Sequence, residues 1–139
     1  AELGYVPVLF HACDRSGDPG YHTNVLLAIG LRSAIVCVEA IAAPDRARVL
    51  DRIAATGRDI VAVDQQGMAD FACNALEFET ADGSTVLAMS QRAFDGMASG
   101  ARRALERSAS RIVTSPIPTI EECGGGSVRC MLAEVFLPR

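Results

Sequence analysis

The sequence contains no lysine, because all 13 basic side chains among its 139 residues are arginine. Without a side-chain amine the protein has no group for Schiff-base catalysis. No apolar run approaches the roughly 18 residues that cross a bilayer, and the first residues do not resemble a signal peptide, so we expect no membrane association. A net charge of −4 and a pI of about 5.1 argue against a nucleic-acid-binding surface.

Paired cysteine motifs are absent as well. The five cysteines are an odd number, and no two of them form a Cys-x-x-Cys pair. This pattern favours neither a disulfide framework nor a zinc site, and we predict no metal and no cofactor. A reducing, cytoplasmic setting is the simplest interpretation. The cysteines are Cys13, Cys37, Cys73, Cys123 and Cys130.

The composition predicts a folded α/β chain. Half of the residues are apolar, and no linker-like or low-complexity stretch divides residues 1–139, so we predict one domain. A pattern of strand, strand, helix and strand occurs twice, with a period of about fifty residues. The first unit covers residues 22–63 and the second covers residues 72–115. The predicted strands are 24–29, 34–38, 59–63, 75–80, 85–90 and 111–115, and the predicted helices begin near Pro44 and Ser99.

The two ends of the chain continue this pattern. Residues 6–12 read as the closing strand of a preceding unit, and residues 127–137 read as the opening strand of a following one. We therefore expect part of a cyclic architecture, with two full units and flanking strands. The sequence would begin part-way through one unit and end part-way through another.

A glycine run leads into the most reactive candidate of the chain. Gly124 to Gly126 precede Arg129 and Cys130, and an apolar stretch follows. Glycines let backbone N–H groups approach a small ligand, and a neighbouring arginine stabilises a thiolate. The alternative is an inert cysteine buried in a strand, beside a merely flexible turn. The adjacency of these features favours a nucleophilic Cys130.

A nucleophilic cysteine needs a proton shuttle, and the chain has two histidines. His22 follows a polar loop and opens a strand, as we expect for Cys130, so a repeat architecture would bring the two together. His22 could equally serve as a loop cap, and His11 reads as a structural histidine inside a strand. Asn24 and Asn74 occupy matching places in the two units. They either bond the local backbone or face a central ligand.

Three segments resemble a known superfamily: residues 21–25, residues 71–77 and residues 119–131. They are similar to the arginine deiminase and amidinotransferase superfamily, closest to its citrulline-hydrolase branch. The resemblance covers essentially the whole chain. It implies the C-terminal half of a five-bladed α/β propeller built from strand-strand-helix-strand units.

The resemblance also implies the roles of individual residues. Cys130 would be the nucleophile that attacks a guanidino or ureido carbon, and His22 would be the general acid and base. The substrate would be a small amino acid, contacted by Asn24, Asn74, Gly126 and Arg129. Deiminases that act on arginine usually carry an aspartate where this chain has Asn24. An uncharged amide there favours the ureido group of citrulline over a guanidinium.

The same resemblance leaves two hypotheses open. The superfamily draws its other carboxylates from a first half that this sequence lacks. The chain is then either an incomplete hydrolase of citrulline-like compounds or a non-catalytic remnant that self-associates and binds at most a small ligand. In both cases we expect a homo-oligomer, most simply a dimer. Glu121 and Glu122 read as part of a solvated turn, and the alternative is that one of these carboxylates contacts a cationic ligand.

Overall fold

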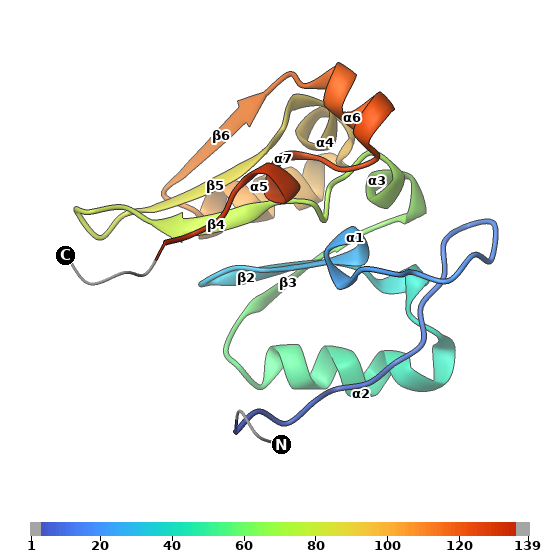
Figure 1. Ribbon diagram of the computed structural model, residues 1–139. Coiled ribbons are helices and arrows are strands. Elements are labelled where there is room, and N and C mark those ends of the chain that lie inside the picture. Colours follow the sequence, from blue (N-terminus) through green and yellow to red (C-terminus); the bar gives the residue numbers. More distant parts are fainter. Residues whose placement is uncertain (1–3, 136–139) are drawn as a thin grey trace.

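The computed structural model describes residues 4–135 and contains two three-stranded sheets (Figure 1). In each sheet the first two strands are antiparallel, and the second and third are parallel. The strand order is β1-β2-β3 in the first sheet and β4-β5-β6 in the second, which confirms the repeat. The strands are β1 (Leu27–Ile29), β2 (Ser33–Cys37), β3 (Asp59–Val63), β4 (Leu76–Glu79), β5 (Thr85–Ser90) and β6 (Arg111–Ser115).

A helical connection joins the parallel strands in each unit. In the first unit a short 3₁₀ turn, η1 (Val38–Ala40), and α2 (Ala43–Ala54) lead to β3. In the second unit α4 (Gln91–Gly96) and α5 (Ser99–Ser108) lead to β6. α2 begins with a proline in its first turn, as the sequence predicts, because a proline there loses no helical hydrogen bond.

The core is formed by the faces that these helices turn to the sheets. Val49 and Ile53 of α2 are buried, and Leu105 of α5 is fully buried. The second unit also contacts the first, because α5 packs against β3 and the Ser108 hydroxyl donates a 3.1 Å hydrogen bond to Ser33 Oγ. α2 lies on the side of the first sheet away from the second sheet (Figure 1). No helix within residues 4–135 is long and apolar enough to span a membrane.

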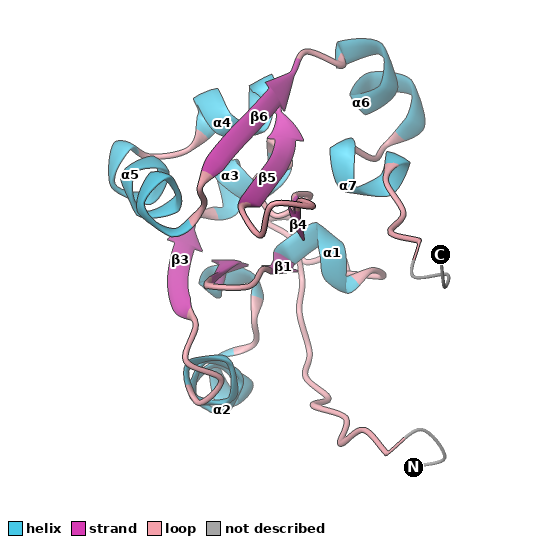
Figure 2. Ribbon diagram, turned by 90° about the vertical axis from the view of Figure 1, so that its left-hand side faces the viewer, coloured by secondary structure: helices cyan, strands magenta, loops and turns pink. Residues whose placement is uncertain are grey.

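The two sheets meet where β1 approaches β4. The Leu31 N–H, just after β1, donates a 2.6 Å hydrogen bond to Glu77 Oε2 of β4. As a result, the segments that precede β1 and β4 lie close to each other. Four short helices lie outside the two repeat connections, and α6 follows the end of β6 (Figures 1 and 2). They are α1 (Thr23–Leu26), α3 (Gln65–Ala69), α6 (Pro118–Gly124) and α7 (Val128–Met131).

The strand predicted for residues 6–12 is wrong. This segment is extended, and Val8, Phe10 and Ala12 pack against the core while Val6 and Leu9 are exposed. From Val8 to Ala12 the side chains thus alternate as in a strand, whereas Val6 breaks the alternation. The segment pairs with the rest of the fold through one bridge at Ala12. Alternation reports which side chains face the core, and it does not provide a neighbouring strand for the backbone to pair with.

The strand predicted for residues 127–137 is also wrong. Residues 128–131 form the helix α7, and residues 132–135 have no regular structure; residues 136 and 137 lie outside the described part. The strand predicted for residues 24–29 begins only at Leu27, because α1 occupies the preceding positions. Both helices are single turns, too short to show a helical period in the sequence.

Candidate active site

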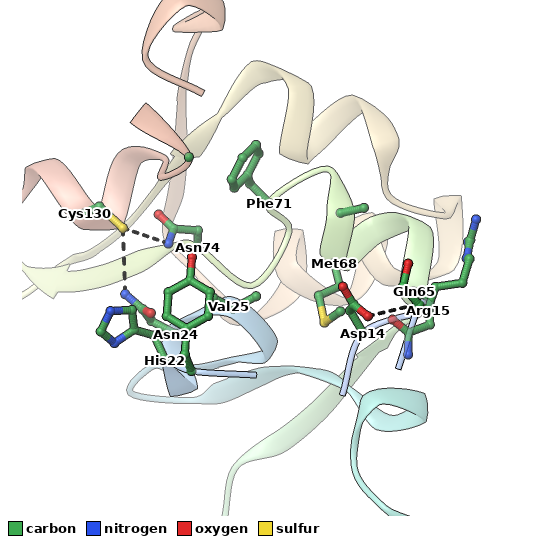
Figure 3. A pocket seen from close by; sticks show the side chains of 14 residues that line it. Asp14, Arg15, His22, Asn24, Val25, Gln65, Met68, Phe71, Asn74 and Cys130 are labelled. Carbon is green, nitrogen blue, oxygen red and sulfur yellow. Dashed lines mark hydrogen bonds between the residues drawn. The ribbon is translucent and has the colours of Figure 1, made fainter. Parts of the chain in front are cut away.

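A pocket of about 490 Å³ opens at the junction of the two units. Its walls come from the loop before α1, from α1, α3 and the segment before β4, and from α7 with the glycine loop. Cys130, His22, Asn24 and Asn74 line one end, and Figure 3 shows them grouped together. The volume lies within the range typical of small-molecule sites.

The glycine loop places Cys130 at this pocket. Gly125 ends α6 with φ of +65°, a left-handed conformation that favours glycine. At Gly126 a Cβ would lie 3.1 Å from Cys130 Sγ and 3.2 Å from its Cβ, so the backbone passes directly beside the sulfur. Cys130 itself belongs to α7 and is exposed, not buried in a strand. A larger residue at position 126 would therefore crowd the side chain of Cys130.

Two asparagine amides face the sulfur. Asn74 Nδ2 donates to Cys130 Sγ at 3.1 Å, and Asn24 Nδ2 donates to it over a longer 3.8 Å (Figure 3). The matching places of these asparagines in the two units therefore converge on one atom. Amide N–H groups are donors, so this arrangement stabilises negative charge on the sulfur.

Asn74 also carries a free acceptor in a buried position. The residue is only 4% exposed, and its Oδ1 has no hydrogen-bond partner among the described residues. Its backbone is fixed from the other side, because its C=O accepts the Arg129 N–H at 3.3 Å. A buried amide oxygen without a partner is costly, and it is available to a donor on a ligand.

Arg129 does not line the pocket. Its guanidinium donates a 3.4 Å hydrogen bond to the carbonyl of Ala75, the residue just before β4. Gly126 is not a wall residue either, whereas its neighbour Gly125 is. Arg129 thus contacts the segment that precedes β4, and neither residue is part of the pocket wall.

His22 lies at the mouth of the same end. It occupies the position before α1, its ring is exposed, and Tyr21 packs edge-on against it with a centroid distance of 4.8 Å. His22 and Cys130 line one pocket without a hydrogen bond between them. His11, by contrast, is not a buried structural residue: its side chain is 96% exposed, beside Asp45.

The sequence predicted neither the backbone of Phe71, which lines the pocket, nor the burial of Glu121, which does not line it. Phe71, at φ +66°, has a left-handed backbone that is rare outside glycine, and the guanidinium of Arg92 lies 5.4 Å from its ring centroid. Glu121 is not solvated but 5% exposed, and its Oε1 accepts a 2.8 Å hydrogen bond from the Ser127 hydroxyl. No local pattern signals either feature, since both depend on contacts between distant segments.

The remaining cysteines differ from Cys130 in their surroundings. Cys37 and Cys73 are fully buried, and Cys13 and Cys123 are exposed. Burial, together with the nearby Cys37, raises the pKa of Cys73 to about 12, so this thiol stays protonated at neutral pH. Within residues 4–135 no three His, Cys, Asp or Glu side chains are grouped so that they could hold a metal ion.

The family model for N,N dimethylarginine dimethylhydrolase, eukaryotic, matches residues 1–137, almost the entire sequence. The chain belongs to the dimethylarginine dimethylhydrolase family. This places it in the superfamily that the motifs around His22, Asn74 and Cys130 indicate. No curated protein matches the sequence.

Solved structures share the fold of this family member. The apo crystal structure of ArgZ, an arginine dihydrolase from the ornithine-ammonia cycle in cyanobacteria, is 17% identical with a TM-score of 0.63, over 86% of this chain and 17% of that chain. The product-bound N-terminal domain of the same protein is 17% identical with a TM-score of 0.60, over 80% of this chain and 36% of that domain. The chain thus spans well under half the length of these relatives.

Proposed function

We propose that this protein hydrolyses a C–N bond at the guanidino or ureido carbon of an arginine-derived amino acid. The observation that carries the proposal is the sulfur of Cys130, which faces the amides of Asn24 and Asn74 in a pocket shared with His22. Membership of the dimethylarginine dimethylhydrolase family supports the same class of reaction. The chemistry needs a thiolate and a proton shuttle and no cofactor.

The proposed reaction has two steps for a ureido substrate. The Cys130 thiolate attacks the ureido carbon and forms a tetrahedral adduct. The bond to the terminal nitrogen then breaks, and His22, as imidazolium, supplies the proton with which ammonia leaves. The neutral His22 next takes a proton from water, and the resulting hydroxide attacks the thiocarbamate carbon. Collapse of this second adduct restores the thiolate and releases a carbamate.

We propose a neutral ureido group, as in citrulline, as the preferred reacting group. A cationic guanidinium is stabilised by a carboxylate close to its nitrogens. Around Cys130 the side chains of Asn24 and Asn74 offer uncharged amides instead. The free Oδ1 of Asn74 is a suitable acceptor for an N–H of the ureido group.

Ammonia release from citrulline tests this proposal. Cys130→Ala should abolish turnover, and His22→Ala should lower the rate by at least about two orders of magnitude, the range for loss of a general acid or base. Cys73→Ala, which changes a buried thiol outside the pocket, is the control and should retain turnover. A Cys130→Ala variant that releases ammonia as fast as the wild type would refute the assignment.

A non-catalytic, self-associating protein is the second candidate. It is favoured by exposed apolar side chains such as Tyr5, Leu9 and Val135, each at least three-quarters exposed. Iodoacetamide at pH 7 separates the two. The proposed hydrolase requires Cys130 to react far faster than Cys13 and Cys123, which are also exposed, whereas equal rates favour the non-catalytic protein.

A further inference from the structure

Phe71 has a strained backbone at the wall of the pocket. Its φ is +66°, and among residues 4–135 it is the single residue other than glycine with a positive φ. Bulky residues avoid this left-handed region because Cβ crowds the backbone there. They keep such a conformation only where the surrounding structure imposes it, and such residues gather at functional sites. The contacts around Phe71 therefore have to hold it in place.

The helix α4 supplies these contacts through the neighbouring Asp70. The guanidinium of Arg92 pairs with Asp70 Oδ1, at 2.8 Å from both Nε and Nη2, and it lies 5.4 Å from the ring centroid of Phe71. Gln66 Nε2 donates to the other oxygen of Asp70 at 2.8 Å. At Gly96, the last residue of α4, a Cβ would lie 3.2 Å from Asp70 Cβ, so this glycine leaves room for the aspartate. Both ends of α4 thus contact Asp70.

Phe71 is connected directly to the residue that faces the sulfur. The Phe71 carbonyl accepts the Asn74 N–H at 2.8 Å, and Asn74 Nδ2 donates to Cys130 Sγ at 3.1 Å. Figure 3 shows Asn74 with Cys130 on one side and Phe71 on the other. Ala72 and Cys73, which lie between them in sequence, are fully buried, so the segment has little freedom to adjust. A change in the backbone of Phe71 would therefore displace the amide from the sulfur.

We infer that Phe71 and the Asp70–Arg92 ion pair are positioning residues, which hold the Asn74 amide against Cys130 and thereby stabilise the thiolate. Arg92 does not line the pocket, so it acts on the sulfur only through this chain of contacts. The inference rests on the proposed function, since the Cys130 thiolate is the nucleophile of the proposed reaction.

Iodoacetamide labelling, followed for each cysteine by mass spectrometry, tests the inference because alkylation reports the thiolate. Arg92→Met should slow alkylation of Cys130 at pH 7 by about threefold to tenfold, the range for weakening a hydrogen bond to a charged group. Arg92→Lys keeps a cation and should react faster than Arg92→Met. At pH 10 an exposed thiol is largely ionised without help, so the wild-type and Arg92→Met rates should converge. Arg102→Met is the matched control, because Arg102 lies 5.7 Å from the ring of Phe94, outside the pocket.

Two substitutions at Phe71 separate the role of its backbone from that of its ring. Phe71→Asn and Phe71→Val both remove the ring, but asparagine tolerates a positive φ and a β-branched residue does not. Phe71→Asn should therefore keep the Cys130 rate within about twofold of the wild type, whereas Phe71→Val should lower it as far as Arg92→Met does. The buried Cys73 has to stay unlabelled in each variant, which shows that the protein is folded.

Asn74→Ala completes the test. In that background Arg92→Met should have no further effect on the Cys130 rate, since the amide through which it acts is gone. An unchanged rate in Arg92→Met, equal slowing by Phe71→Asn and Phe71→Val, or additive effects of Arg92→Met and Asn74→Ala would each overturn the positioning role. A fast wild-type Cys130 would leave the proposed function intact in these cases. A wild-type Cys130 that reacts no faster than the exposed Cys123 overturns both proposals.

Discussion

At the scale of single residues, the surroundings of a cysteine decide what its sulfur can do. Cys130 and Cys73 are linked through Asn74, which donates to the sulfur of the first and follows the second in sequence. Cys73 is fully buried, and its pKa is raised to about 12, first by burial and then by the nearby Cys37. Two adjacent residues thus have different roles: Asn74 donates a hydrogen bond to the candidate nucleophile, and Cys73 carries a thiol that stays protonated.

The raised pKa of Cys73 predicts a loss of stability at alkaline pH. In the unfolded chain this thiol ionises near its ordinary value of about 9, whereas in the folded protein it stays protonated up to about 12. Unfolding then releases a proton between these values, so the free energy of unfolding should fall by about 1.4 kcal/mol per pH unit across this window. Below pH 9 the thiol is protonated in both states, so none of this stability is lost there.

Urea unfolding at pH 8, 9 and 10 measures this effect. The free energy of unfolding should fall more steeply with pH in the wild type than in Cys73→Ala, whatever stability the substitution itself removes. Cys123→Ala removes an exposed cysteine and serves as the control, because its slope should match the wild type. Identical slopes for all three proteins would contradict the prediction.

Asn24 should control the preference between neutral and cationic ligands. Asn24→Asp places a carboxylate near Cys130 Sγ, where the amide donates now, and should shift relative affinity from citrulline toward arginine by about tenfold or more. Calorimetric titration of both ligands into the Cys130→Ser protein gives the ratio. Asn24→Ser, which adds no charge, should weaken both ligands without inverting their order. An unchanged ratio in Asn24→Asp would show that this position does not select the substrate.

At the scale of elements, α6, the glycine loop and α7 work as one positioning unit for Cys130. Glu121 of α6 reaches across the loop to Ser127, and both side chains are buried. The Ser127 carbonyl in turn accepts the Cys130 N–H at 3.0 Å. The orientation of the sulfur therefore depends on the hydrogen bond between Glu121 and Ser127, two residues that precede Cys130 in sequence.

Removal of that hydrogen bond should loosen the cysteine. In Glu121→Ala the buried Ser127 hydroxyl loses its acceptor, which should lower the free energy of unfolding by about 1 to 3 kcal/mol and slow the reaction of Cys130 with iodoacetamide. Glu121→Gln keeps an acceptor oxygen and should retain the reaction rate. Glu122→Ala changes the exposed neighbour and is the matched control. Equal rates in all four proteins would show that Glu121 is only a packing residue.

The elements that the sequence predicts are those with a local signal. The two units follow from alternating apolar residues, from the Asp-Gly turn between β4 and β5, and from Pro44 at the start of α2. The convergence of Asn24 and Asn74 follows from their matching places in the repeat. The extended course of residues 6–12, the single turn α7 and the burial of Glu121 have no such signal, because partners distant in sequence decide them.

At the scale of the whole molecule, apolar surface remains exposed beside the site. Val6 and Leu9 of the extended N-terminal segment are 77% and 78% exposed. Met131, Leu132 and Val135, which follow Cys130, are 47%, 43% and 75% exposed. Monomers rarely keep large apolar patches in contact with water, and the outer strands of both sheets present unpaired backbone groups.

These surfaces predict that the chain forms a homo-oligomer, most simply a dimer with closed two-fold symmetry. Light scattering at micromolar concentration should therefore give twice the chain mass of 14.7 kDa. Leu9→Asp places a charge on the exposed apolar segment and should shift the equilibrium toward the monomer. Ala47→Asp adds the same charge to the exposed face of α2 and should leave the dimer intact. A wild-type protein that scatters as a 14.7 kDa monomer and unfolds cooperatively would rule out self-association as the means of covering this surface.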